Sequence, residues 1–450
     1  MAMAIKPEID EPENASGGGT RLRQLRQQLA WTWFPESDRE ASEAVVRNLW
    51  LHWFPSKVLK GSLSWGYSLW LGTAAVSLFG ILTVTGILLM FFYVPSVERA
   101  YWTMKDIQYA TSLGWLLRNQ HRWAAHLMVA AVFLHMARVF FSGAYRGSRS
   151  LNWLVGIVLL MATLLFSFTG YLLPWDQLAF WAVTVGTNIA KAAPLVGDTI
   201  RFLLLGGSEI GQNALVRFYV LHVAVLPTFV LLLVTYHMWR VRKDGGLAYA
   251  ERLRHERVAQ PKSPVRSKSY SLFGVTRGAS VQVLSSTAVE EEDTVFASPD
   301  LIRRAALIFL IVFNLTLLLS LISDAPLEEA ANFAVTPNPA KAPWYFLWLQ
   351  ELVAITTIRV GGFSISGGLI GGIVIPGILL LAAAAWPFMD RSSHAVEGVW
   401  FPRERRAQNA VFLLVSVVIV VLVLIGLYIR GPYWKLYLPW QAWPQMPRQL

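Results

Sequence analysis

The sequence predicts an all-α membrane protein with seven spanning helices, and composition is the first indication. Of the 450 residues, 55% are hydrophobic and only 15% are charged. A soluble domain of this length does not need so much apolar surface. The apolar residues gather in runs long enough to cross a hydrocarbon core at about 1.5 Å per helical residue. These runs are Leu69–Tyr93, Trp123–Phe141, Leu154–Leu173, Leu215–Met238, Ala305–Leu321, Ile365–Phe388 and Val411–Tyr428.

Lysine and arginine in the short loops predict the orientation of the chain. The loop after the second run has Arg146 and Arg149 without an acid, and the fourth run leads into Arg240, Arg242 and Lys243. The loop before the seventh run is also basic, whereas the alternate loops are mixed in sign. We therefore expect the basic loops and the N-terminus on the cytoplasmic side of a bacterial inner membrane. The net charge of +11 then meets anionic lipid headgroups, and nucleic acid is not an expected partner.

The chain divides into four expected parts. Residues 1–63 form an N-terminal cytoplasmic segment that lacks the features of a signal peptide. Between residues 21 and 60 its basic side chains alternate with Trp and Phe, as in a helix lying in the headgroup layer. Residues 64–242 hold the first four runs. A polar linker with Pro, Ser and an acidic run occupies residues 243–299, and residues 300–450 hold the last three runs.

Four histidines lie at matched positions on the second and fourth runs. His121 and His135 are fourteen residues apart, and His222 and His237 are fifteen apart. Each interval keeps both side chains on one helical face, about 21 Å apart along the axis. Because the two helices run in the same direction, His121 pairs with His222 near the outer side and His135 with His237 near the cytoplasm. A membrane histidine can also simply bond a neighbouring carbonyl, but paired depths favour two bis-histidine sites.

Two further sets of residues match these intervals. Arg118 lies three residues before His121, and Arg138 lies three residues after His135. Both positions suit salt bridges to haem propionates. The alternative is that both side chains only snorkel to the membrane surface at a helix end. Each bis-histidine site suits a haem whose iron has an imidazole on both faces. Because this completes the coordination of the iron, such a haem carries electrons and does not bind oxygen. His126 is about 140° from the ligand face and is expected to pack or to donate or accept a hydrogen bond. Glycines on the first and third runs repeat the fourteen-residue interval, as Gly72 with Gly86 and Gly156 with Gly170. A glycine lets the flat edge of a macrocycle approach the backbone, and the alternative is that these glycines serve ordinary helix packing.

Three segments carry a family resemblance. They are GWLLRNQHRWAAHLMVAAVFLHMAR at 114–138, GYLLPWDQLAFWAVTV at 170–185 and RFYVLHVAVLPTFVLLLVTYH at 217–237. They resemble the second helix, the turn and surface helix after the third, and the fourth helix of the cytochrome b family of Rieske/cytochrome b complexes. HRW, PWDQ and the fifteen-residue interval are similar to the chloroplast and cyanobacterial branch. The resemblance covers residues 64–245, and more loosely 300–440.

Three departures from that branch are visible. The four-helix part and the three-helix part, which is similar to subunit IV, are fused here in one chain. Trp70 stands where the branch attaches an extra haem to a cysteine, and the chain has no cysteine. No covalent haem or iron–sulfur cluster is therefore expected on this chain. Pro343 stands where the family has the glutamate of its Pro-Glu-Trp-Tyr motif, before Trp344 and Tyr345.

The resemblance implies a quinol oxidoreductase that passes electrons to cytochrome c or another high-potential acceptor. Quinol is oxidised at the outer side, and electrons cross the membrane through two b haems to a quinone-reducing site, with proton translocation. The implied partners are a Rieske iron–sulfur protein and a c-type cytochrome or equivalent acceptor, in a dimeric complex that contacts quinone and lipids.

The resemblance also implies where quinol and quinone bind. Trp344 and Tyr345 belong to the outer site, and Trp181 and Asp176 are expected to line or rim it. We expect Glu351 to replace the missing glutamate as proton acceptor, or to be an interfacial carboxylate without a catalytic task. At the inner site Arg242 and Lys243 are expected to attract quinone or a propionate, or to reflect only the positive-inside bias.

Two other functions compete with this one. A dihaem membrane anchor that relays electrons between a dehydrogenase and the quinone pool explains the four histidines but not the last three runs. A transporter explains the seven runs but not the paired histidine depths.

Overall fold

The computed structural model describes residues 57–244, 246–248, 294–360, 363–392 and 396–443. The expected headgroup helix in residues 21–60 and most of the 243–299 linker lie outside the described residues. At its C-terminal end the expected helix is wrong, because Lys57–Leu59 forms strand β1. It pairs with β2 (Thr294–Phe296) in an antiparallel sheet that joins the approach to the first spanning helix with the approach to the fifth.

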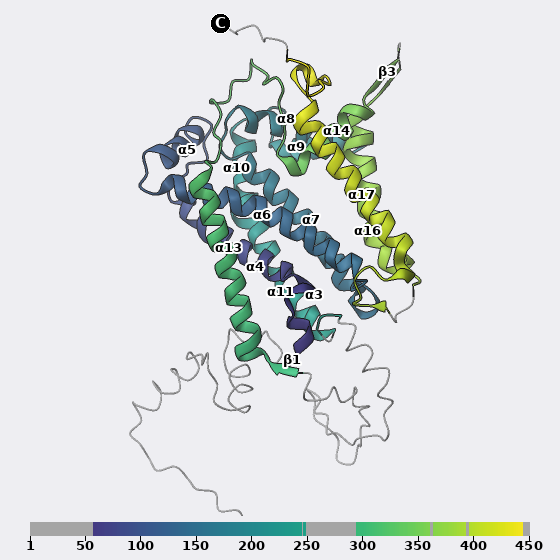
Figure 1. Ribbon diagram of the computed structural model, residues 1–450. Coiled ribbons are helices and arrows are strands. Elements are labelled where there is room, and N and C mark those ends of the chain that lie inside the picture. The colour runs from purple at the N-terminus through teal and green to yellow at the C-terminus, as the bar shows by residue number, and fades with distance from the viewer. Residues whose placement is uncertain (1–56, 245, 249–293, 361–362, 393–395, 444–450) are drawn as a thin grey trace, which may run out of the picture.

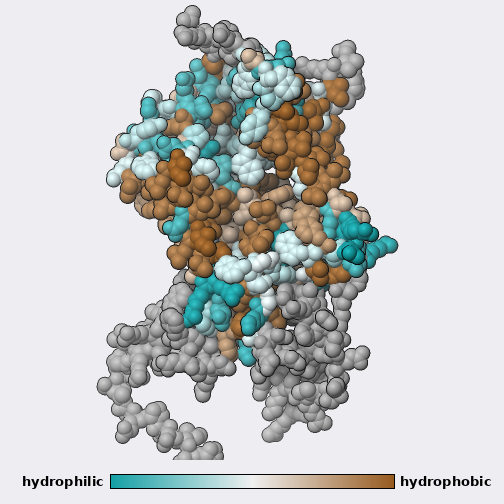
Figure 2. Space-filling view, in the orientation of Figure 1, coloured by the Kyte–Doolittle hydropathy of each residue, from teal (hydrophilic) through white to brown (hydrophobic). Residues whose placement is uncertain are grey.

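Seven helices of the described chain are long and apolar enough to cross a membrane, which confirms the expected number. Figure 2 shows broad hydrophobic areas over the middle of one face, with hydrophilic residues toward its ends. The seven are α4 (Leu71–Met90), α6 (Gly114–Phe141), η3–α7 (Gly147–Tyr171), α10–η4–α11 (Gln212–Lys243), η6–α13 (Ala297–Ile322), α15–η7–α16 (Gly367–Met389) and η9–α17–η10 (Arg403–Ile429).

Helix α6 begins at Gly114, nine residues before the expected run. Its added turns are polar and buried against protein instead of lipid. Asn119 is fully buried and its Nδ2 donates to Ser320 O at 3.0 Å and to Asp324 Oδ1 at 2.8 Å, while its Oδ1 accepts from Ala325 N. Hydropathy alone does not detect these turns, because their partners are more than 200 residues away in the sequence.

Two of the spanning helices contain a π-helical segment just before a proline. Leu221–Val225 precedes Pro227, and Ile370–Val374 precedes Pro376. Proline has no N–H to donate and its ring crowds the preceding turn, so a wider turn accommodates it. His222 lies in the first of these segments, and π-turns are frequent at functional sites.

The first four spanning helices form a bundle with surface helices gathered at one end, here called the surface-helix end (Figure 1). Helix α5 (Ala100–Tyr109) connects α4 to α6, and α8 (Gln177–Lys191) and α9 (Gly197–Leu205) connect α7 (Ser150–Tyr171) to α10 (Gln212–Val220). Asp176 caps α8 by accepting a hydrogen bond from Ala179 N at 2.8 Å, which fixes where α8 begins.

The three C-terminal spanning helices flank the bundle on different sides. Helix α13 (Ile302–Ile322) packs against α4 and α6, whereas α16 (Ile375–Met389) packs against α7. Helix α14 (Trp344–Thr356), followed by the β3–β4 hairpin (Ile358–Val360 and Phe363–Ile365), packs against α17 (Arg406–Leu424). Figure 1 shows α13 on one side and α16 and α17 on the other.

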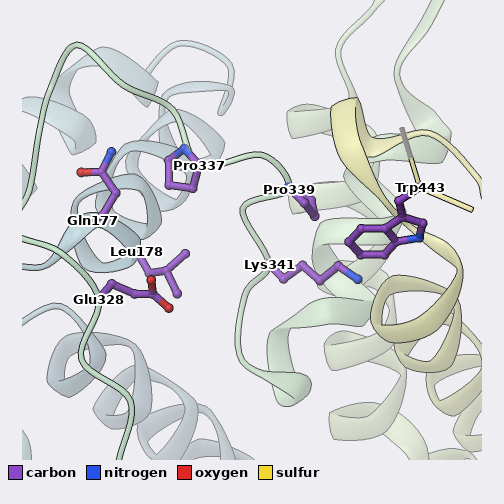
Figure 3. A pocket seen from close by; sticks show the side chains of 7 residues that line it. All are labelled: Gln177, Leu178, Glu328, Pro337, Pro339, Lys341 and Trp443. Carbon is purple, nitrogen blue, oxygen red and sulfur yellow. The ribbon is translucent and has the colours of Figure 1, made fainter. Parts of the chain in front are cut away.

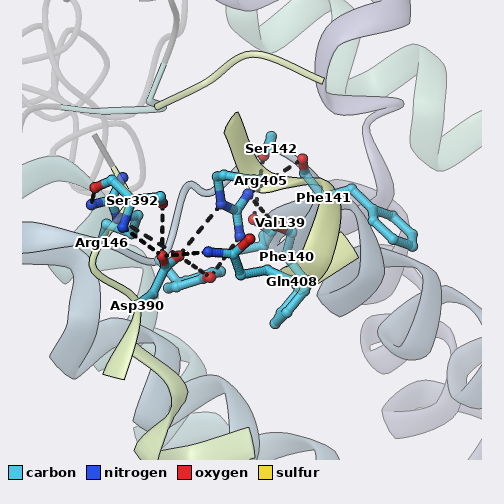
Figure 4. A network of polar contacts seen from close by, with 10 residues as sticks. Val139, Phe140, Phe141, Ser142, Arg146, Asp390, Ser392, Arg405 and Gln408 are labelled. Carbon is cyan, nitrogen blue, oxygen red and sulfur yellow. Dashed lines mark hydrogen bonds and ion pairs between the residues drawn. The ribbon is translucent and has the colours of Figure 1, made fainter. Parts of the chain in front are cut away.

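A buried charged network joins the bundle to the C-terminal part at the end opposite the surface helices (Figure 4). Asp390 accepts a hydrogen bond from Tyr145 Oη at 2.6 Å and lies 3.4 Å from Arg405 Nε and 3.8 Å from Arg146 Nε. Burial alone would raise the pKa of Asp390, but hydrogen bonds from Tyr145 and Ser392 and the Arg405 charge lower it to about 2. The network ties the α6–α7 loop to the loops at both ends of the α16–α17 connection.

Replacing Asp390 with Asn should destabilise the chain by about 3 kcal/mol, because the buried Arg405 guanidinium loses its counter-charge. Thermal unfolding in detergent, followed by circular dichroism, measures this. Since the folded-state pKa of Asp390 is depressed, its stabilising contribution is present above the unfolded pKa and is lost as pH falls through about 2.

The matched control is Asp198→Asn. Asp198 forms an ion pair with Lys191 at 3.4 Å, but its side chain is 87% exposed, so its loss should change stability by less than about 1 kcal/mol. Equal unfolding temperatures for the two variants would contradict a structural role for the Asp390 network.

Candidate functional site

The first histidine pair joins α6 to the π-segment of the fourth spanning helix. The ring centroids of His121 and His222 are 6.3 Å apart, with their planes at 71°. The glycine contacts of this pair come from the ends of α4 and α7 nearest the surface helices. The structure therefore brings together the two histidines that the sequence pairs at one depth.

A threonine hydroxyl orients each ring of this first pair. His121 Nδ1 lies 2.8 Å from Thr85 Oγ1, and His222 Nδ1 lies 3.2 Å from Thr169 Oγ1. Each hydroxyl also donates to the carbonyl four residues earlier in its own helix, so its oxygen is the acceptor for the ring N–H. Nε2 is then left with a lone pair, the arrangement that metal-binding histidines need.

Sequence reasoning missed these two threonines. The available signal was a Thr-Gly dipeptide at the same place in both glycine-bearing helices, at residues 85–86 and 169–170.

The second histidine pair lies nearer the opposite end of the bundle. The ring centroids of His135 and His237 are 6.4 Å apart, with their planes at 79°. Both pairs thus have nearly the same separation and a nearly perpendicular ring arrangement. The sequence-predicted partners meet at both depths.

Each of the four predicted glycines lies against one imidazole ring. A Cβ added to Gly170 would lie 2.4 Å from His222 Cε1, and one added to Gly72 would lie 3.1 Å from His135 Cε1. At Gly86 the corresponding distance to His121 is 3.3 Å, and at Gly156 the distance to His237 is 3.8 Å. The close approach that glycine permits therefore admits the ligand rings themselves, in addition to any macrocycle edge.

The two pairs fit an iron porphyrin between their rings. Metal–nitrogen bonds of about 2.0–2.1 Å, with about 1.1 Å from each ring centroid to its nitrogen, separate two collinear imidazole centroids by about 6.3 Å. The observed separations are 6.3 and 6.4 Å. In the described chain, no group of three or more His, Cys, Asp or Glu side chains is arranged to hold a metal ion by itself. Each pair could supply two ligands to an iron whose other four ligands come from a porphyrin.

The two arginines predicted beside the histidines have different surroundings. Arg138 is buried, its Nε donates to Tyr67 O at 3.3 Å and its guanidinium lies 4.5 Å from the Tyr67 ring centroid. Its Nη2 is buried without a hydrogen bond, which suits an anionic group such as a propionate. Arg118 donates instead to Gln108 Oε1 and to the carbonyls of Ala325 and Pro326. Arg118 thus also anchors the loop that follows α13.

Trp70 occupies the position at which the chloroplast and cyanobacterial branch, which this sequence resembles, carries a cysteine. Its side chain is buried at the start of α4, and its ring centroid lies 5.8 Å from that of Trp65. The indole fills this space within the core shared by α4, α6 and α13.

A cavity of about 1340 Å³ lies between α6, α7, α8, α14, α16 and α17. Trp344, Tyr345 and Trp181 line it toward the surface-helix end, and Phe140 and Trp386 line it toward the opposite end. Trp181 Nε1 donates to Val335 O at 3.0 Å, which holds the loop before α14 against α8. The lining is almost entirely apolar, and the cavity runs along much of the depth of the spanning helices.

His126 contacts the Trp-Tyr pair at the end of this cavity. Trp344 Nε1 donates to His126 Nδ1 at 2.9 Å, and the His126 and Tyr345 ring centroids are 5.7 Å apart. Its hydrogen-bonding role agrees with its predicted position away from the ligand face of α6. Its connection to the Trp-Tyr motif was not predicted.

The structure does not bring Glu351 to the cavity. Arg430 binds the Glu351 carboxylate side-on, with Nε at 2.9 Å from Oε2 and Nη2 at 2.5 Å from Oε1. The carboxylate is 1% exposed and is not among the cavity-lining groups. The expectation that Glu351 accepts a proton therefore loses its geometric support, and the ion pair instead fastens α14 to the C-terminal segment.

A second cavity of about 330 Å³ lies at the surface-helix end, between α8 and the loop before α14. Figure 3 shows Gln177 and Glu328 on one side of it and Lys341 and Trp443 on the other. Leu178 and Lys341 line both cavities. Asp176, predicted to rim this region, binds backbone N–H groups of Ala179 and Glu328. Burial nevertheless raises its pKa.

The basic residues predicted for the inner site lie on the last turn of α11. Arg242 and Lys243 follow the second histidine pair, and Lys243 Nζ lies 5.0 Å from the Trp239 ring centroid. They are at the end of the bundle opposite the surface helices.

Comparisons with known proteins agree with this arrangement. A family model described as Cytochrome b/b6/petB matches residues 55–245. The chain is 35% identical over 223 residues to cytochrome b6 of Prochlorothrix hollandica, covering 50% of this chain and 96% of that protein. It is 41% identical over 175 residues to cytochrome b6 of Euglena gracilis, covering 39% of this chain and 81% of that protein.

A solved structure is similar over more of the chain. A chain of a structure titled Hyperthermophilic respiratory Complex III matches with a TM-score of 0.63 and 24% identity, covering 82% of this chain and 86% of that chain. At this identity the likeness shows the fold alone. Its coverage extends beyond the first four spanning helices into the C-terminal part.

Replacing Gly170 with Ala should displace the His222 ring, because the added Cβ would lie 2.4 Å from His222 Cε1. We expect the variant to lose the haem of the first pair. Gly156→Ala is the matched control on the same helix, since its Cβ would make an ordinary 3.8 Å contact with His237. The haem-to-protein ratio of purified membranes or detergent extracts measures both, and equal ratios in the two variants would contradict this packing.

Proposed function

The chain belongs to the cytochrome b/b6 family, and we propose that it is the dihaem membrane subunit of a quinol-oxidising electron-transfer complex. The observation that carries the proposal is the pair of facing imidazoles at each of two depths between α6 and the fourth spanning helix. Two haems b, one held by His121 and His222 and the other by His135 and His237, fit those separations.

The residues around the pairs have definable tasks. A bis-histidine haem supplies reversible one-electron transfer without an open position for oxygen. Thr85 and Thr169 orient the first pair of rings by accepting hydrogen bonds from their Nδ1–H groups. Arg138 offers a buried guanidinium nitrogen to a propionate. The four glycines Gly72, Gly86, Gly156 and Gly170 allow α4 and α7 to approach the ligand rings.

The large cavity supports a quinol as the substrate. A quinol has an aromatic head with two hydroxyl groups and a long apolar tail, and it reaches its site from the bilayer. The cavity combines an apolar wall along the membrane depth with the Trp344–Tyr345 segment at the surface-helix end. We assign Trp344 and Tyr345 to the wall around the quinol head, with Trp181 and Asp176 on its rim.

Orientation and the inner site follow from charge. We place the surface-helix end outside and the basic end in the cytoplasm of a bacterial inner membrane, which also puts the N-terminus in the cytoplasm. Electrons then move from the first histidine pair to the second, toward a quinone-reducing site near Arg242 and Lys243. Proton release outside and uptake inside would conserve energy as a gradient.

The chain has no cysteine, so an iron–sulfur centre must lie on a partner. We propose a Rieske iron–sulfur protein and a c-type cytochrome or equivalent acceptor, in a dimeric complex. A dihaem anchor between a dehydrogenase and the quinone pool is the second candidate function. The cavity wall formed by α14, α16 and α17 favours the quinol-oxidising complex, because a relay by the four-helix bundle does not require these elements.

A redox-titrated visible spectrum of the purified chain tests the haem assignment. We expect two low-spin b haems of unequal potential. His222→Ala should remove one haem and His237→Ala the other, while far-ultraviolet circular dichroism stays close to that of the native chain. A single haem in the native chain, or loss of the same spectral component in both variants, would contradict the assignment.

A further inference from the structure

The large cavity lacks, at its surface-helix end, the carboxylate that the sequence resemblance leads us to expect as a proton acceptor. Pro343, which has no titratable side chain, occupies that position at the N-cap of α14. Glu351 on the same helix is bound on both oxygens by Arg430. Removing a proton from a quinol hydroxyl still needs a base within hydrogen-bond reach, directly or through one water.

His126 is not itself a lining residue, but its ring contacts the two aromatic residues that line the cavity at the surface-helix end, Trp344 and Tyr345. Val129 and Ala130, three and four residues further along α6, line the cavity, so His126 lies on the same side of α6, one turn nearer the surface-helix end. Its ring lies against Tyr345, and its Nδ1 accepts the Trp344 indole N–H at 2.9 Å. Accepting that bond means that Nδ1 carries a lone pair and Nε2 carries the proton.

The neighbouring titratable groups are less suitable bases. Burial raises the pKa of Tyr345 to about 12, so it keeps its proton. Asp176 already accepts two backbone hydrogen bonds at the start of α8. Arg122, which lies close enough to His126 and Tyr345 to influence both electrostatically, is a permanent cation. Among these groups, the imidazole is the one that presents an unprotonated nitrogen at the Trp344–Tyr345 end of the cavity.

We propose that His126 is the proton acceptor of the outer site and that the Trp344 indole covers it until substrate binds. The proposal rests on the proposed quinol-oxidising function. A quinol hydroxyl takes the place of the indole N–H at His126 Nδ1. The O–H bond breaks with its electron pair left on oxygen, and an N–H bond forms at Nδ1. The imidazolium then gives its proton to water at the outer surface.

Two variants separate proton acceptance from anchoring of the indole. His126→Asn keeps an oxygen near the Nδ1 position, so it can still accept the Trp344 bond but cannot take up a proton. Trp344→Phe removes the indole donor and leaves the imidazole in place. Each is made in the complete complex, and the two-haem spectrum verifies that the variant has folded.

The assay is oxidation of a decyl-chain benzoquinol by the complex, over a range of pH. We expect His126→Asn to lower kcat by about 100-fold or more, with KM within a few-fold of the native value. It should also remove the fall in kcat toward low pH that a protonated base causes. Trp344→Phe alters the wall around the quinol head and should change KM, but it should keep the fall in kcat toward low pH, because the imidazole remains in place. Infrared difference spectra on quinol addition should contain imidazolium ring bands that are missing in His126→Asn.

Three results would overturn the proposal. The first is native turnover in His126→Asn. The second is a loss in Trp344→Phe as large as that in His126→Asn, with no imidazolium bands in the native complex, because this would limit His126 to anchoring the indole. The third is a loss confined to Glu351→Gln, which would assign the base to Glu351. Failure of the native complex to oxidise any quinol while its two haems remain intact would instead overturn the proposed function.

Discussion

The separation between facing imidazoles on two helices that run in the same direction is the constraint on which this fold depends. Helix α6 and the fourth spanning helix must bring His121 to His222 and His135 to His237 at 6.3 and 6.4 Å. Two intervals, of fourteen and fifteen residues, must therefore be matched across the bundle. The π-segment at His222 is where the longer interval is accommodated, because a π-turn changes the angular position of the residues that follow it.

The flanking helices are adapted to the same constraint. Glycines on α4 and α7 let these helices approach the imidazole rings, most closely at Gly170. At the first pair the residue before each glycine supplies a hydroxyl that selects the tautomer of the ring. Each Thr-Gly dipeptide thus provides both the space for an imidazole ring and the hydrogen bond that orients it.

Buried polar contacts place the C-terminal helices around this bundle. Asn119 and Arg118 hold the end of α13 and the loop after it. At the opposite end Asp390 and Arg405 hold the loops beside α16 and α17. Such contacts are costly to bury without partners, so each of them specifies where its partner helix must lie. One consequence is the apolar cavity that α6 and α7 share with the last two spanning helices, which Trp344 and Tyr345 line at the surface-helix end.

The sequence by itself determined the seven spanning helices, the pairing of the four histidines and the glycines that oppose them. These features depend on hydropathy and helical periodicity, which are local properties of the chain. Only the tertiary structure decided the start of α6 at Gly114, the strand at Lys57–Leu59, the capture of Glu351 by Arg430 and the bond between Trp344 and His126. The two side-chain bonds join residues at least 79 positions apart in the sequence. The strand and the start of α6 likewise depend on contacts with distant segments. A linear pattern carries no information about which distant polar groups meet, because their pairing energy exists only once the helices have packed.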